Sequence, residues 1–192
     1  TGDIAHALAA IGDAATPHLL PGLRHVDPNV RHAVVRVLAT SSLPTASAAL
    51  RTVLRDDPSA RVRQAAAAHG PLMSAEAIDA LISVVGNTEE WGAVRAEAAD
   101  SLGRLGVSKA EGTLEAGLAD AIPQVRAACA TALGELHSDE AAGPLAKLAQ
   151  NTSELSLVRV AAVQALGALG DVAEPALLRL AAEEVGAVRE AA

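Results

Sequence analysis

Residues 125–137 read VRAACATALGELH, and this stretch decides the fold because close copies of it recur along the chain. The dipeptide Val-Arg occurs six times, and its arginines stand 32, 32, 31, 33 and 30 residues apart. These arginines are Arg31, Arg63, Arg95, Arg126, Arg159 and Arg189. Such a constant period is the signature of a repeat array, so one short structural unit is expected to occur again and again.

Each copy of the motif predicts an amphipathic helix. Apolar or small residues follow the arginine on one stripe of a 3.6-residue period, for example Val125, Ala128, Cys129, Ala132 and Leu133. A glycine or alanine follows the last leucine. In several units a second glycine follows, and it suits a left-handed C-terminal cap; these glycines are Gly12, Gly106 and Gly170.

A second helix is expected to follow the first in each unit, with a proline in or near its first turn, where the missing N–H is not needed. These prolines are Pro17, Pro44, Pro144 and Pro175. Two helices of about 12 residues cannot cover both of their apolar stripes with each other, so the units must stack side by side. The sequence therefore predicts an all-α protein, an α-solenoid of antiparallel helix pairs.

The whole chain, residues 1–192, is expected to form a single array of about six repeats of 30–33 residues. The expected units are approximately 1–26, 27–56, 57–87, 88–120, 121–151, 152–183 and a partial unit at 184–192. Both ends fall inside a repeat, so the native protein is expected to continue in both directions.

The ends of such an array present apolar faces with no capping unit. We therefore predict that the 192-residue chain self-associates end to end through alanine and leucine surfaces. Sedimentation at several concentrations tests this, and a monomer at every concentration would contradict it.

The pattern Asp-Pro-x-Val-Arg-x-Ala-Val at 27–34 and its later form VRVAAVQALGALG at 158–170 resemble the HEAT-repeat superfamily. The resemblance is particularly to the short HEAT-like repeats of the phycobilisome (PBS) lyase type, and it covers the whole chain. It implies a right-handed superhelix whose second helices line a concave groove that holds partners. It also implies a scaffold, adaptor or binding array rather than an enzyme.

The six repeated arginines have two interpretations, an anion-binding stripe or a structural ladder between units. In HEAT-like repeats this arginine typically bonds an acidic residue before the helix. The sequence supplies such an acid four to seven residues before each arginine: Asp27, Asp57, Glu89 or Glu90, Asp120, Glu154 and Glu184. We favour the ladder, because charge pairs at a fixed position set how repeats stack.

The charge is unevenly distributed along the chain, which has a formal net charge of −8. Residues 1–64 carry seven arginines against five aspartates, whereas residues 65–192 carry eight basic against 18 acidic residues. Net acidity repels a phosphate backbone, so nucleic acid is an unlikely partner. A single cysteine excludes an internal disulfide, and no apolar run approaches the ~20 residues of a membrane span. The expected location is the cytoplasm.

Residues that suggest chemistry have plainer explanations. The histidines are His6, His18, His25, His32, His69 and His137, and no His-Glu pair of the kind that holds iron in the HEAT-like deoxyhypusine hydroxylases occurs. No nucleotide-binding loop of the GxxxxGK type is present. We expect no metal or other cofactor, a buried thiol at Cys129 and a packed side chain at Trp91. His69 interrupts the motif, and residues 69–73 are expected to form a hinge.

The favoured function is a non-enzymatic protein-binding scaffold. Its candidate partner-binding residues lie on the second helices: Ser47, Arg51, Arg55, Glu76, Asp79, Glu111 and Glu115. The acidic members favour a basic partner toward the middle units. One alternative is an accessory subunit or domain of an enzyme, similar to the bilin lyases. A less favoured alternative is nucleic-acid binding through Arg24, Arg31, Arg36, Arg51 and Arg55, against which stands the lack of aromatic stacking residues.

Overall fold

A computed structural model describes residues 12–68 and 74–190, with side chains described through residue 182. Within these residues every regular element is a helix, so the predicted all-α class is confirmed. The contacts divide the chain into two compact units, residues 1–101 and 102–192, and the boundary falls inside helix α7. Among the described residues, no helix combines the length and apolar character needed to span a membrane.

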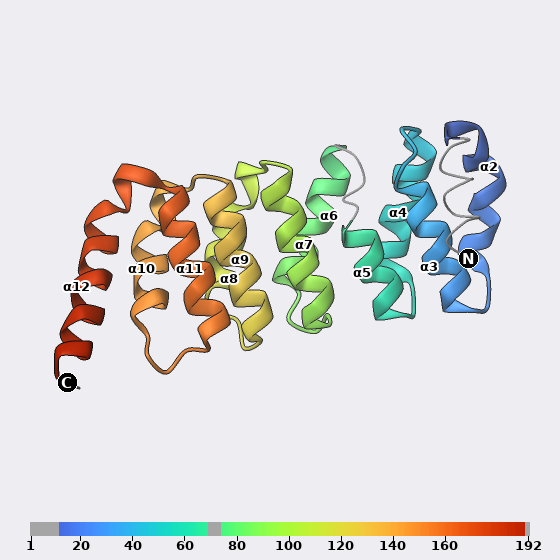
Figure 1. The fold of residues 1–192 in the computed structure, drawn as a ribbon. Coiled ribbons are helices and arrows are strands. Elements are labelled where there is room, and N and C mark those ends of the chain that lie inside the picture. Colours follow the sequence, from blue (N-terminus) through green and yellow to red (C-terminus); the bar gives the residue numbers. More distant parts are fainter. Residues whose placement is uncertain (1–11, 69–73, 191–192) are drawn as a thin grey trace. The chain divides into compact units, whose positions relative to one another are not determined.

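The first unit consists of short helices that run back and forth (Figure 1). Its longer helices pack as neighbours in the pairs α3 with α4, α3 with α5, α4 with α5 and α4 with α6. The elements are η1 (Gly12–Ala15), α2 (Thr16–Leu19), η2 (Leu20–Arg24), α3 (Pro28–Leu38), α4 (Pro44–Asp56), α5 (Ala60–Ala68), α6 (Ala75–Gly86) and α7 (Gly92–Arg104), which crosses the boundary.

The second unit repeats the same alternation, and its first helices α9 and α11 pack along each other. Helices α10, α11 and α12 each pack against the other two. The elements are η3 (Ser108–Ala110), α8 (Glu111–Gly117), α9 (Pro123–Glu135), η4 (Asp139–Ala141), α10 (Ala142–Gln150), α11 (Ser156–Ala168), η5 (Gly170–Val172) and α12 (Glu174–Glu190).

The predicted helix ends follow local chemistry. Pro17 and Pro44 occupy first-turn positions, as expected for a residue that has no N–H to donate. Gly106 and Gly170 have φ angles of 66° and 63°, which confirms their predicted left-handed caps. His137 takes the same conformation, with φ 52°, at the end of α9. Its ring Nδ1 lies 2.9 Å from the Ala168 carbonyl oxygen of the following first helix.

The core is built almost entirely from Leu, Val and Ala, and Cys129 lies within it, fully buried as predicted. Small residues let the first helices approach closely in the second unit. A Cβ added at Gly134 would lie 2.7 Å from the Ala165 Cα, too close for any side chain. The equivalent Gly167 on α11 has nothing within 4 Å of such a Cβ.

One buried hydroxyl compensates for the interrupted motif at residue 69. Ser101 stands at the position that Val37, His69, Ala132 and Ala165 hold in the other repeats, and its Oγ donates a 2.7 Å hydrogen bond to the Ala67 carbonyl oxygen. In a continued α-helix that carbonyl would accept from residue 71, which is a proline and has no N–H. The proposed hinge at 69–73 itself lies outside the described residues.

The prediction that Trp91 is packed is wrong, because its side chain is 69% exposed. Trp91 directly precedes α7, and the equivalent Ile122 and Leu155 are N-cap residues of α9 and α11. Leu155 is likewise more than half exposed. An N-cap residue lies before the first full turn of the helix. The helical period therefore does not fix the direction of its side chain, and its apolar character does not predict burial.

The contrast between Gly134 and Gly167 gives a matched stability test. Gly134→Ala forces apart α9 and α11 and is expected to lower the free energy of unfolding by about 1–3 kcal/mol. Gly167→Ala meets open space inside a helix and is expected to raise it by roughly 0.5–1 kcal/mol. Urea unfolding of both variants measures this, and equal effects would contradict the close approach at Gly134.

Candidate functional site: the face of the second helices

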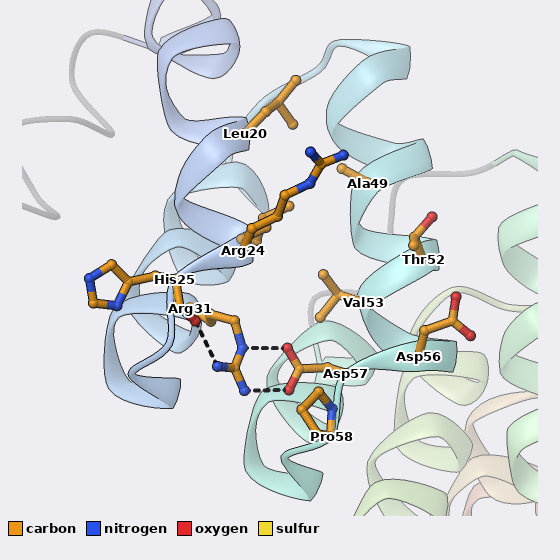
Figure 2. A pocket seen from close by; sticks show the side chains of 11 residues that line it. Leu20, Arg24, His25, Arg31, Ala49, Thr52, Val53, Asp56, Asp57 and Pro58 are labelled. Atoms are coloured by element: carbon orange, nitrogen blue, oxygen red, sulfur yellow. Dashed lines mark hydrogen bonds and ion pairs between the residues drawn. The ribbon is translucent and has the colours of Figure 1, made fainter.

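The arginine of the Val-Arg motif joins one repeat to the next. In the first unit, the Arg31 guanidinium donates from Nε to Asp57 Oδ2 at 2.7 Å and from Nη2 to Asp57 Oδ1 at 2.9 Å. Its Nη1 donates to the carbonyl oxygens of His25 and Val26, in the loop before its own helix. One side chain therefore binds its own loop and the loop of the following repeat (Figure 2).

The same arrangement recurs at two further positions. Arg63 forms two 2.7 Å hydrogen bonds to Glu90 and one of 2.6 Å to the Asp57 carbonyl oxygen. In the second unit, Arg126 reaches Glu154 Oε1 at 2.6 Å through Nη2 and the Asp120 carbonyl oxygen through Nη1. The buried Nε of Arg126 has no hydrogen-bond partner within the described part of the chain.

The other motif arginines contact backbone carbonyls. Arg95 donates from Nε and Nη2 to the Val85 carbonyl oxygen, both at 3.0 Å. Arg159 donates from Nε to the Ala149 carbonyl oxygen, also at 3.0 Å. Each of these carbonyls belongs to the end of the preceding second helix. The side chain of Arg189 lies outside the described residues.

The ladder carboxylates have lowered pKa values. Burial favours the protonated form of Asp57, but the hydrogen bonds from Arg31 and from the Ser59 N–H outweigh it, so the pKa of Asp57 lies below its ordinary range. Burial opposes ionisation of Glu90 in the same way, and Arg63 and the Trp91 N–H hold its pKa low. The hydrogen bond from Arg126 is the main reason that the pKa of Glu154 is lowered.

Two adjacent aspartates give a test of this ladder. The side chains of Arg31 and Asp57 are 9% and 4% exposed, so Asp57→Asn leaves a buried guanidinium without its anion. This substitution is expected to lower the free energy of unfolding by about 3–5 kcal/mol. The neighbouring Asp56 pairs with Arg55 on the surface, and Asp56→Asn is expected to leave the melting temperature unchanged. Thermal unfolding of both variants at pH 7 checks the difference; equal melting temperatures would refute the ladder.

The same pair predicts the response to acid. Folding lowers the pKa of Asp57, so its ionised carboxylate stabilises the folded chain. This stabilisation is complete above about pH 4 and is lost as the pH falls through the lower pKa of the folded state. The melting temperature of the parent chain is expected to fall more steeply below pH 4 than that of Asp57→Asn. Parallel curves would contradict this.

Four of the predicted partner-binding residues meet at one cavity. Arg51 and Arg55 on α4 and Glu76 and Asp79 on α6 line a cavity of about 470 Å³ between these second helices. Arg51 Nη1 lies 3.5 Å from Glu76 Oε2 across it. The pKa of Glu76 is lowered by its backbone N–H and by the Ser74 hydroxyl, so the rim keeps a negative charge. Leu54 and Val84 supply apolar lining.

Three predicted residues do not join this cavity. Ser47 is on α4 but is only 7% exposed, and its Oγ has no hydrogen-bond partner among the described residues, so it is not available at the surface. It lies on the buried stripe of α4. Glu111 and Glu115 are on α8 in the second unit, where Glu111 accepts a 2.8 Å hydrogen bond from the Ser138 hydroxyl.

A second cavity was not predicted from the sequence. It measures about 490 Å³ and lies between η2 and α4, and Arg24 and His25 are among the residues that line it (Figure 2). Leu20, Leu23 and Val53 form its apolar lining, and the Arg31–Asp57 pair lies at one end. Within the described part of the chain, Arg24 has no carboxylate partner. Several of its lining residues lie 31 positions before residues that line the α4–α6 cavity, and this repeat offset could have predicted it from the sequence.

The residues considered for metal chemistry do not gather in the described part of the chain, where no three His, Cys, Asp or Glu side chains are placed as metal ligands. His25 instead accepts a 3.0 Å hydrogen bond from the Asp27 N–H at its ring Nδ1. His6 and His69 lie outside the described residues.

These features define the class of protein: a helical repeat array whose units are joined by arginine–carboxylate pairs. A family model for HEAT repeats matches residues 3–69 and 111–192. The chain therefore belongs to the HEAT-repeat family, as the sequence predicted.

Two solved structures are similar in fold. An engineered protein is similar at a TM-score of 0.53 with 22% identity, over 94% of this chain and 57% of that one. This chain therefore spans little more than half of that protein, and the likeness shows the fold alone. Human deoxyhypusine hydroxylase in complex with glycerol is similar at a TM-score of 0.46 with 23% identity, over 93% of this chain and 70% of that one. No curated protein matches by sequence.

Proposed function

We propose that the chain is a non-enzymatic protein-binding scaffold, and that the face of its second helices holds a charged segment of a protein partner. The observation that carries the proposal is the α4–α6 cavity, where two arginines and three acidic residues surround an apolar lining. Apolar pockets with a few charged groups at the rim are the usual form of a recognition site. The charged rim supplies specificity and the lining supplies affinity.

The arrangement of the arginines supports a protein partner over a nucleic acid. Arg31 is paired with Asp57, Arg51 lies beside Glu76, and Arg55 is paired with Asp56. These carboxylates neutralise three of the five arginines that could have formed a basic patch. A phosphate backbone would meet acidic groups along the same surface, which weakens its binding.

The proposal predicts that charge reversal on α6 weakens binding. The chain is screened against a library of random 12-residue peptides, and the enriched peptides are expected to carry Lys or Arg. Glu76→Lys combined with Asp79→Lys is expected to lower their affinity about tenfold and to remove its salt dependence, because two attractive charges become repulsive.

Glu89→Lys is the matched control, since Glu89 is exposed, close in sequence and outside the cavity lining. It reverses one charge, as each of the two substitutions on α6 does, and is expected to leave the affinity unaltered. If no peptide is enriched, or if the control weakens binding as much as the reversal on α6, the proposed function is wrong.

The predicted end-to-end self-association also remains a proposal, with one supporting observation. Leu157, Val160 and Val163 form an exposed apolar stripe on α11. The residues of α9 that correspond to Val160 and Val163, Ala127 and Ala130, are buried in the array. In the proposed self-association, the first helix of a repeat from a second copy of the chain would pack against this stripe.

A further inference from the structure

The two cavities of the first unit are copies of one pocket, one repeat apart. Each takes a leucine and an arginine from the earlier second helix, and an alanine, a hydroxyl residue and a valine from the later one. The corresponding pairs, all offset by 31 residues, are Leu23 and Leu54, Arg24 and Arg55, Ala49 and Ala80, Thr52 and Ser83, and Val53 and Val84. The ladder carboxylates Asp57 and Glu90 lie at the corresponding ends.

The charges at the two pockets differ. The first has Arg24 at its edge, with no carboxylate partner among the described residues (Figure 2). The second has Glu76 and Asp79 on its later helix, where the first has Thr45 and Ala48. It also has Arg51 beside Glu76, where the first has Leu20, but with Glu90 its acidic residues still outnumber its two arginines by one. An occupant that spans both pockets is therefore matched by an acidic group near the first and a basic group near the second.

The distance between the pockets favours one backbone conformation for a segment that occupies both. Neighbouring packed helices lie roughly 8–10 Å apart, so equivalent pockets between consecutive second helices are separated by about the same distance. A polyproline II segment has three residues per turn and rises about 3.1 Å per residue. Its side chains at i and i+3 thus point the same way about 9 Å apart. In a β-strand, i and i+3 point to opposite faces.

The pocket rims favour such a segment over a helix. An α-helix also brings side chains into line at i and i+7, about 10 Å apart, but its backbone groups are bonded internally. A polyproline II backbone leaves its N–H and C=O groups free. At the second pocket, the exposed side chains of Ser83 and Asn87 can bond to them. At the first, the Thr52 hydroxyl donates to Ala48 and Asp56 accepts from Arg55, but the oxygens of both side chains can also accept from an N–H of the segment.

We infer that the paired pockets bind a polyproline II segment of the partner, with apolar side chains at i and i+3 seated in the two pockets. An acidic residue beside the first apolar residue contacts Arg24, and a basic residue beside the second contacts Glu76 and Asp79. This inference rests on the proposed function, since it specifies the partner of the same face.

A spacing series on the unaltered chain tests the inference. The probes are fluorescein-labelled peptides DLPPLK, with leucines at i and i+3, DLPLK at i and i+2, DLPPPLK at i and i+4, and a helical peptide with leucines at i and i+7. Fluorescence anisotropy is expected to show that DLPPLK binds about tenfold more tightly than the others, because only it seats both leucines. KLPPLD, with the charges exchanged, is expected to bind more weakly than DLPPLK.

Filling either pocket identifies where the peptide binds. Ala49→Leu and Ala80→Leu are each expected to lower the affinity for DLPPLK about tenfold and to remove the preference for leucines at i and i+3. Ala93→Leu makes the same change at an exposed position of α7 outside both pockets and is expected to change nothing. Melting curves of the three variants exclude loss of folding as the cause.

The outcomes separate the two proposals. If charged peptides bind but all spacings are equivalent, or the helical peptide binds best, the paired-pocket inference is wrong and the proposed function stands. If Ala49→Leu and Ala80→Leu behave as Ala93→Leu does, the inference is also wrong. If no charged peptide binds the chain at all, both fail.

Discussion

The structure depends on an arginine that binds two loops at once. In Arg31 and Arg63, Nη1 donates to a carbonyl of the loop before the arginine's own helix, while Nε and Nη2 reach the carboxylate of the next loop. A planar guanidinium has its donors in a fixed geometry, so this double contact sets both the distance and the orientation between consecutive loops. The repeats are therefore held in a defined register, which alanine-rich helix surfaces by themselves would specify weakly.

The register at the loops is matched by polar contacts at the other end of the first helices. In the first unit, Asp13 accepts hydrogen bonds from the Ser41 hydroxyl and from Ser42, and these contacts lower its pKa. In the second unit, Glu111 accepts a hydrogen bond from the hydroxyl of Ser138, which follows α9. With contacts at both ends, successive second helices are placed alike, and this explains why the two cavities repeat with a constant 31-residue offset.

The sequence predicts those features that depend on period, and it does so well. The helix pairs, the caps at Gly106 and Gly170 and the charged rim of the α4–α6 cavity all follow from position within a repeat. Features set by a single residue's surroundings were missed. Ser47 carries a polar group but occupies the buried stripe of α4, and Trp91 is apolar but stands outside the stripe of α7. The cavity beside Arg24 was missed because the apolar residues of its lining, Leu20, Leu23 and Val53, look like core residues in a sequence.

The composition also limits how this surface can bind. With Ala, Leu and Val as almost the only apolar residues, the helices pack closely and the apolar part of each cavity lining comes mainly from aliphatic side chains. One such cavity buries too little apolar area to bind tightly by itself. Two equivalent cavities within one compact unit would change this, because a segment held in the first is already close to the second and its second contact becomes intramolecular. For the proposed partner segment, affinity would therefore depend on the register of the repeats, which the arginine–carboxylate pairs set; the Arg31–Asp57 pair also lines the first cavity itself.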